Sequence, residues 1–81
     1  MSEHVTPEAA EKLVDDVSTL YVEQIVTERR AAVPDQERLK ALKEQLAACA
    51  ADREALQDAG PKEVAEIAAR YAARARELGG R

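Results

Sequence analysis

Three prolines divide this chain and restrict where its helices can begin and end. Proline is tolerated best in the first turn of a helix, and the residue before it is driven out of the helical region. Pro7 follows Thr6, and Pro34 precedes Asp35, so both places offer an N-cap residue. Pro61 follows a glycine, which is favoured where a helix ends. The sequence therefore predicts helices at 7–32, 36–58 and 61–78.

The apolar residues between these breaks recur at helical spacing, so that each segment has one apolar face. The faces comprise Ala10, Leu13, Val14, Val17, Leu20, Tyr21 and Ile25 in the first segment; Leu39, Leu42, Leu46, Cys49, Arg53 and Leu56 in the second; and Val64, Ile67, Ala68, Tyr71, Ala75 and Leu78 in the third. Short connections between long helices make sequence neighbours antiparallel. The predicted fold is all-α, a single antiparallel three-helix bundle over residues 1–81.

One stretch, LYVEQIV at residues 20–26, departs from the helix-forming composition around it. Its β-branched and aromatic residues favour a strand. A helix through the same residues, at 100° per residue, places Leu20, Tyr21 and Ile25 on the core side. Val22 and Val26 then fall on the far side. We expect a helix with apolar residues on two sides.

The composition predicts a thin core. The chain of 81 residues has 17 Ala but only seven Leu, seven Val and two Ile, and neither Phe nor Trp. Because a small core leaves marginal stability, binding to a partner would add to it. The sequence has no run of about 18 apolar residues and no signal-peptide pattern at its start. We expect a soluble, cytoplasmic protein.

Few residues are suited to catalysis or to holding a metal or cofactor. Cys49 and His4 are the only Cys and His, and zinc needs about four ligands. Cys49 lies on the apolar face, and the glycines lie at helix ends rather than in a phosphate-binding loop. Asp15 and Asp16 are adjacent, so on a helix they point in different directions. We expect no enzyme activity, no metal and no cofactor.

Arg53 is the one charged residue on the apolar face of the second segment. Its stem is expected to cover the core while its guanidinium reaches an acid near the start of the first helix, Asp16 or Glu11. A partner-facing charge is the alternative. A small helical mutase would need several inward basic residues around an anionic substrate, and Arg53 alone does not meet that need.

Charge is distributed unevenly along the chain. Residues 1–28 hold seven acids and one base, whereas residues 61–81 hold three acids and five bases. An acidic face is repelled by nucleic acid and attracted to a basic cleft. Arg70 and Arg74 lie at helical spacing from Glu66 and Glu77, which predicts ion pairs on a solvated face. We expect neither a nucleic-acid nor a membrane partner.

The far side of the first helix is the candidate binding face, acidic in its N-terminal half and apolar in its C-terminal half. Its predicted partner-binding residues, called here the outer stripe, are Glu8, Glu11, Asp15, Thr19, Val22 and Val26. Exposed valines are common and by themselves need no function. The alternative is that the acids enter a basic site on another protein while the valines contact its apolar rim.

The layout of residues 7–78 resembles the small three-helix antitoxins that neutralise zeta-type kinase toxins. The resemblance lies in a capped acidic helix (TPEAAEKLVDDVSTLYVEQIV), a charged heptad helix (DQERLKALKEQLAACAADREAL) and a third helix (PKEVAEIAARYAARARELGG). In that family the toxin is a P-loop kinase that phosphorylates a nucleotide-sugar, and the first helix of the antitoxin blocks its nucleotide site. The resemblance implies a bacterial protein whose Glu8, Glu11 and Asp15 are attracted to a phosphate-binding site.

Two functions of different classes follow from these observations. The first is a non-enzymatic inhibitor, of the antitoxin or immunity type, that occludes the nucleotide or substrate site of a partner enzyme with its acidic first helix. The second is a structural or scaffolding bundle that forms a homodimer through Val22, Val26 and its alanine-rich faces. The two hypotheses differ in what covers Val22 and Val26, which is the partner enzyme in the first and a second copy of the chain in the second.

Overall fold

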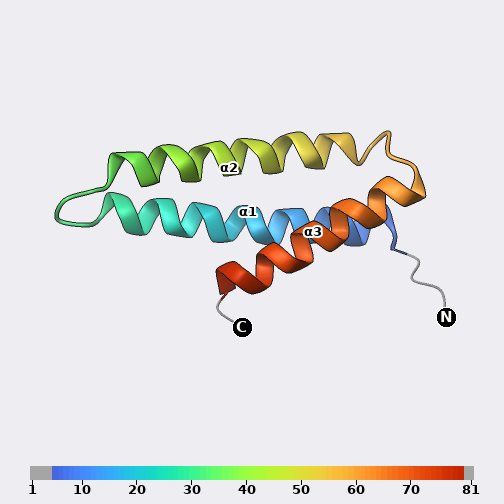
Figure 1. Ribbon diagram of the computed structural model, residues 1–81, viewed down its shortest axis with the longest axis horizontal. Coiled ribbons are helices and arrows are strands. Elements are labelled where there is room, and N and C mark those ends of the chain that lie inside the picture. Colours follow the sequence, from blue (N-terminus) through green and yellow to red (C-terminus); the bar gives the residue numbers. More distant parts are fainter. Residues whose placement is uncertain (1–4, 80–81) are drawn as a thin grey trace.

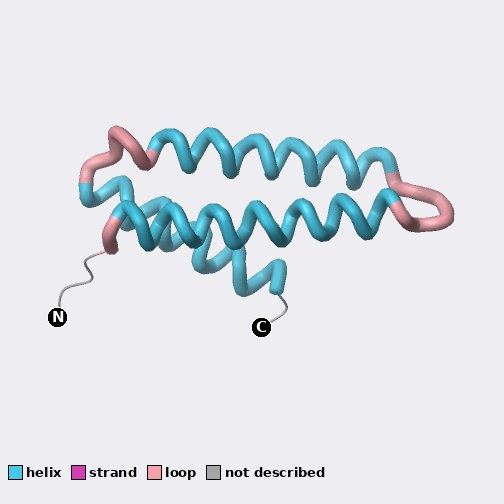
Figure 2. Tube along the Cα trace, turned by 180° about the vertical axis from the view of Figure 1, so that it is seen from behind, coloured by secondary structure: helices cyan, strands magenta, loops and turns pink. Residues whose placement is uncertain are grey.

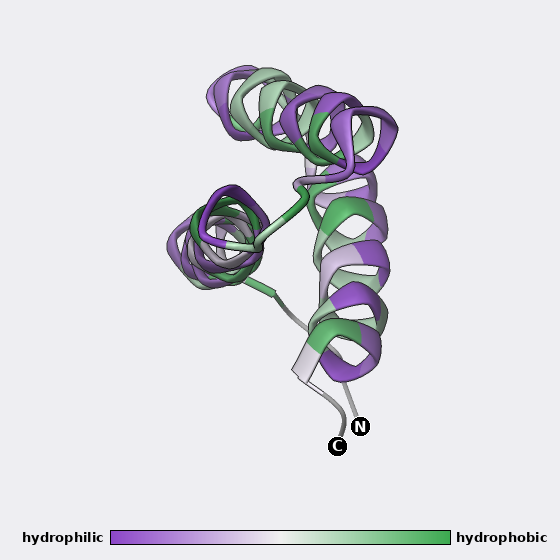
Figure 3. Cartoon of the chain, turned by 90° about the vertical axis from the view of Figure 1, so that its left-hand side faces the viewer, coloured by the Kyte–Doolittle hydropathy of each residue, from purple (hydrophilic) through white to green (hydrophobic). Residues whose placement is uncertain are grey.

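The computed structural model describes residues 5–79, which form α1 (Pro7–Arg29), α2 (Gln36–Ala55) and α3 (Pro61–Gly79). α1 and α2 lie antiparallel, and α3 returns obliquely across α1 (Figure 1). α1 packs against both other helices and lies in the angle between them when viewed along the long axis (Figure 3). The described residues contain no strand, so LYVEQIV is helical. The predicted all-α, antiparallel three-helix bundle is confirmed.

The bundle is elongated, with extents of 49 × 26 × 15 Å and a radius of gyration of 14.2 Å. A compact chain of this length would have a radius of gyration of about 12 Å. The shape arises because the end of the α1–α2 hairpin that carries the loop extends past α3 (Figure 1). No helix within residues 5–79 is long and apolar enough to cross a membrane.

Side-chain caps set the starts of α1 and α2. The Thr6 hydroxyl accepts a hydrogen bond from the backbone N–H of Ala9 at 3.0 Å. The Asp35 carboxylate accepts from the N–H groups of Glu37 and Arg38, each at 3.1 Å. Such bonds satisfy N–H groups that have no partner within the helix. Both starts agree with the positions expected from the prolines.

The ends of the first two helices fall earlier than the sequence suggested. α1 ends at Arg29 rather than at 32, because residues 30–35 are needed to reverse the chain direction between antiparallel helices. α2 ends at Ala55 rather than at 58. After it the backbone tightens into bonds between residues three apart, such as Asp58 N–H to the Ala55 carbonyl at 3.2 Å. α3 ends at Gly79, one residue beyond the expected 78.

Removing the Asp35 cap is expected to weaken the α1–α2 hairpin. Asp35→Ala should lower the free energy of unfolding by about 1 kcal/mol, because two N–H groups of α2 lose their acceptor. Urea unfolding followed by circular dichroism measures this loss. Asp58→Ala removes the same kind of charge from an exposed turn residue and serves as the control. Equal losses in both variants would contradict a capping role for Asp35.

The core is a single cluster of small and medium apolar side chains. Its buried members are Ala10, Val14, Val17, Tyr21, Ile25, Leu39, Leu42, Cys49, Leu56, Val64, Ile67, Ala68 and Tyr71. Each of them belongs to a predicted apolar face. Leu13 and Leu20, also expected to point inward, are only half-buried, because they lie at the edge of the face that α2 and α3 cover. Leu13 still packs against the core cluster, whereas Leu20 is not among the residues packed against it. The prediction that Leu20 points inward was therefore only partly right.

Polar contacts join α3 to the other two helices. The Tyr71 hydroxyl donates to the carboxylate of Asp52, and Arg70 lies 3.7 Å from the same carboxylate. Arg74 donates to the Tyr21 hydroxyl at 2.7 Å and to the side-chain oxygen of Gln45 at 3.1 Å. Both tyrosine rings are buried, as expected for core residues.

The predicted partners of Arg70 and Arg74 were wrong. The sequence suggested ion pairs with Glu66 and Glu77 within α3. The structure instead turns both guanidiniums toward α2, where Asp52 and Gln45 lie within reach. The oblique crossing of α3 decides this choice, since it brings polar groups of α2 closer to the arginines than their own helix does. The hydrogen bond from Arg74 to the Tyr21 hydroxyl also raises the pKa of that guanidinium.

Candidate functional site

The six residues of the outer stripe all lie on α1, and the structure leaves them on its surface. Glu8, Asp15 and Thr19 are exposed, and Glu11 is half-buried. Val22 and Val26 are 43% and 37% exposed, among the few large apolar side chains in residues 5–79 that face solvent. The prediction that these two valines point away from the core is confirmed. The stripe follows from the spacing of three or four residues that aligns side chains along a helix.

Arg53 of α2 contacts two of the three acids in the outer stripe, Asp15 and Glu11. The Arg53 guanidinium donates from Nε to Asp15 Oδ1 at 2.8 Å and from Nη2 to Asp15 Oδ2 at 3.4 Å. Its Nη2 also lies 3.8 Å from Glu11 Oε1. The hydrogen bond to Asp15, with the charges of Asp15 and Glu11, raises the pKa of Arg53. About half of each of these side chains remains accessible to solvent.

This arrangement corrects part of the expectation for Arg53. The arginine does reach across to α1, and Glu11 is one of its partners, but Asp15 rather than Asp16 is the main one. Asp16 points away and pairs with Lys12 on its own helix at 3.3 Å. Adjacent residues on a helix differ by about 100° in direction, so only one of the two aspartates can face α2.

The antiparallel packing gathers acids from all three helices at one end of the molecule. That end combines the start of α1, the end of α2 and the start of α3 (Figure 1). Residues 5–16 and 52–66 hold nine acids and three bases, a formal charge of −6. Residues 17–51 and 67–79 hold six acids and eight bases, a formal charge of +2. The described part of the chain is therefore charge-polarised along its length, and we call the first region the acidic end.

Most acids of the acidic end were not assigned to a site by the sequence. They are Asp16, Asp52, Glu54, Asp58, Glu63 and Glu66, in addition to the three acids of the outer stripe. The sequence did contain a signal for this cluster of acids, because antiparallel packing places the end of the second helix beside the start of the first. Acids concentrated around the second break therefore had to lie near those at the start of the chain.

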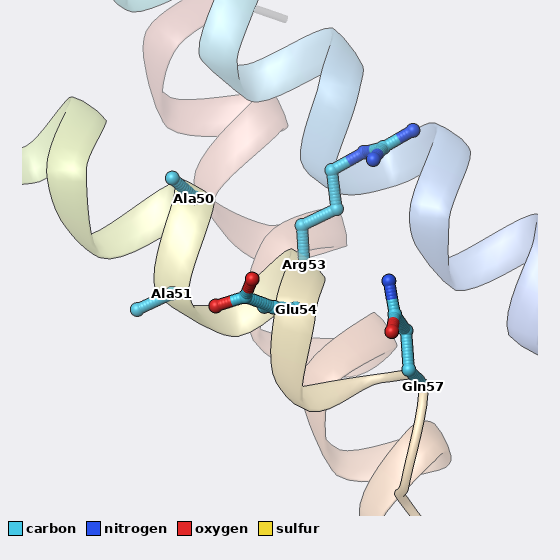
Figure 4. A pocket seen from close by; sticks show the side chains of 5 residues that line it. All are labelled: Ala50, Ala51, Arg53, Glu54 and Gln57. Atoms are coloured by element: carbon cyan, nitrogen blue, oxygen red, sulfur yellow. The ribbon is translucent and has the colours of Figure 1, made fainter.

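The surface hollows offer little chemistry. One hollow of about 310 Å³ is lined by Ala50, Ala51, Arg53, Glu54 and Gln57 on the outside of α2. In Figure 4 the Arg53 side chain extends toward α1, and Glu54 points in another direction. A second hollow, of about 190 Å³, lies between the start of α1 and the turn after α2, and Glu8 and Glu11 line it. Neither hollow combines a nucleophile with a base.

Two predictions about ligating residues concern Cys49 and His4. Cys49 is 1% exposed and belongs to the core cluster, as expected for a small apolar residue. His4 lies outside the described residues. Within residues 5–79 no group of three or more His, Cys, Asp or Glu side chains is arranged to hold a metal ion.

Comparisons of this chain with models of protein families, with curated proteins and with solved structures gave no match.

Proposed function

We propose that this chain is a non-enzymatic inhibitor that binds a partner enzyme and occludes its nucleotide or substrate site with α1. The observation that carries the proposal is the acidic end, which holds nine carboxylates and three cations and includes the three acids of the outer stripe. Such a field attracts a basic cleft and repels nucleic acid. The acidic end enters the cleft, and the valines farther along the stripe contact the apolar rim.

The contacts of Arg53 support this role. A carboxylate that is already oriented loses less conformational entropy on binding than a freely rotating one. Asp15 is held in two hydrogen bonds to Arg53, and Glu11 lies beside the same guanidinium. Both carboxylates keep accessible surface, so each can accept further bonds from a partner. The inhibitor supplies no reacting group and acts by excluding the partner's ligand.

The partner that we propose is a zeta-type kinase toxin with a P-loop, which would make this chain its bacterial antitoxin. A site built to bind nucleotide phosphates is rich in backbone N–H groups and basic side chains. It suits Glu8, Glu11 and Asp15, which can occupy the positions of phosphate oxygens. Together with the resemblance of the three-helix layout, this complementarity favours a kinase over other enzymes.

The test measures inhibition of a purified zeta-type kinase encoded beside this chain. The wild-type chain should inhibit ATP-dependent phosphorylation of the nucleotide-sugar and should compete with nucleotide for the kinase. The triple variant Glu11→Lys, Asp15→Lys and Val22→Asp should weaken inhibition at least about tenfold, because it reverses two charges and places a carboxylate at the apolar rim. Circular dichroism verifies that the variant stays helical.

A matched control places the same kinds of change elsewhere. Glu37→Lys, Glu44→Lys and Ala69→Asp reverse two charges on α2 and add a carboxylate on exposed α3 surface. This control should inhibit as the wild type does. Inhibition by the stripe variant equal to that by the control would rule out the outer stripe as the binding face. Failure of the wild-type chain to bind the kinase would reject the partner.

A further inference from the structure

The valine half of the outer stripe lies on a side of α1 that no other helix of this chain covers. α3 crosses α1 on one side (Figure 1), and from behind, α1 lies in front of α3 with nothing over it (Figure 2). Val22 and Val26 are exposed, and neither belongs to the core cluster or packs against it. This face is the largest apolar feature of α1 that the fold leaves without a partner.

The charges along this face change sign from one end to the other. Asp15 lies seven residues before Val22, and Arg29 lies seven residues after it. Seven residues are nearly two full helical turns, so all three side chains share one side of α1. Asp15 and Arg29 are both exposed. Among the ion pairs of residues 5–79, none involves Arg29.

We infer that the free chain forms a homodimer in which the outer stripes of two α1 helices pack antiparallel around a twofold axis at Val22. In this register Val22 meets Val22 of the second copy, and Val26 packs beside Thr19 and Val22 of that copy. Asp15 lies opposite Arg29 of the second copy, because both are equally far from the axis, about 10 Å along the helix. The twofold symmetry repeats this ion pair on the other side.

The charge pattern selects the antiparallel orientation. In a parallel pair Asp15 would lie against Asp15 and Arg29 against Arg29, and like charges in contact are unfavourable. In the antiparallel pair every such contact becomes attractive. The bond of Asp15 to Arg53 does not prevent this contact, since a carboxylate has about four acceptor positions and about half of the Asp15 side chain is exposed.

The dimer is expected to be weak. Each copy contributes only two valines of modest exposure, and much of the remaining contact is polar and screened by salt. A dissociation constant of about 10–1000 µM fits an interface of this kind. The inference does not rest on the proposed function, since it concerns the chain alone. If both hold, the dimer and the enzyme compete for the same face of α1.

Sedimentation equilibrium of the wild type, of Arg29→Glu, of Asp15→Lys and of a 1:1 mixture of the two variants tests the dimer. Each variant alone faces two repulsive contacts, so its dissociation constant should rise on the order of tenfold or more. In the mixture a dimer can form from one copy of each variant. The Glu at position 29 of one copy then meets the Lys at position 15 of the other, and the unchanged Asp15 meets the unchanged Arg29. The mixture should therefore recover dimerisation to nearly the wild-type level.

Two control variants carry the same charge changes away from the stripe. Asp16→Lys alters the neighbouring aspartate, which points elsewhere, and Arg76→Glu alters the basic residue in the last turn of α3. Both should dimerise as the wild type does. A parallel dimer would be no weaker in either stripe variant than in the wild type, which would overturn the proposed orientation. A wild-type chain that stays at its monomer mass of 8.8 kDa up to about 1 mM would overturn the dimer itself.

Discussion

Ile67→Ala is expected to lower the free energy of unfolding by about 2–5 kcal/mol, the largest effect of any single change considered for this chain. Ile67 is 2% exposed and lies in the core cluster with Val14, Val17 and Val64. Truncation removes apolar contacts and leaves a cavity that the neighbouring small side chains cannot fill. A chain of this length has a total stability of about 4–12 kcal/mol. The variant should therefore lose a large share of its stability and unfold at a much lower urea concentration than the wild type.

Urea unfolding followed by circular dichroism measures the loss, at low protein concentration so that association does not contribute. Val33→Ala is the control, because Val33 is 85% exposed in the loop between α1 and α2. A surface change of this kind should stay within about 0.5 kcal/mol of the wild type. Similar unfolding midpoints for the two variants would show that α3 does not pack through Ile67 as described.

The second large effect is expected at alkaline pH and depends on Tyr71. Burial of Tyr71, with its hydrogen bond to Asp52 and the neighbouring Cys49, raises the pKa of the hydroxyl well above its ordinary value of 10.0. Between that ordinary value and the raised one, the unfolded chain releases the Tyr71 proton and the folded chain keeps it. The stability contributed by Tyr71 is therefore complete below about pH 10 and is lost as the pH rises further.

The loss has an upper limit of about 1.4 kcal/mol for each pH unit above 10. Urea unfolding at a series of pH values from 9 to 12 measures it, and tyrosinate absorbance reports ionisation directly. Tyr71→Phe is expected to be less stable than the wild type by about 1 kcal/mol at neutral pH, because Asp52 loses a donor. Its stability should fall less steeply above pH 10. An equally steep fall in both proteins would remove Tyr71 as the cause.

The candidate site could be predicted from the sequence only where helical geometry decides it. Val22 and Val26 had to lie on the opposite side from Tyr21 and Ile25 once the segment was helical, and their exposure bears this out. The contact of Asp15 with Arg53 was not predicted, since Asp16 or Glu11 was the expected partner and Asp15 was assigned to the outer stripe alone. That choice depends on the rotation of α1 against α2, which is fixed by the packing of Ala10, Val14 and Val17. The role of the stripe in binding stays a prediction.

By itself the sequence determined the class of the fold, the starts of the helices and the residues of the core. These features are local or periodic: Pro7, Pro34 and Pro61 restrict the backbone, Thr6 and Asp35 cap the helices, and the apolar spacing defines one face per helix. Because such interactions join residues a few positions apart, they can be read along the chain.

Only the tertiary structure decided how charges and hydroxyl groups pair between helices. The oblique course of α3 gave Arg70 and Arg74 partners on α1 and α2 rather than on α3. The antiparallel order gathered acids from three segments into one acidic end and left the far side of α1 uncovered. The physical reason is that crossing angle and rotation of the helices result from the packing of the whole core, which no single segment of sequence specifies.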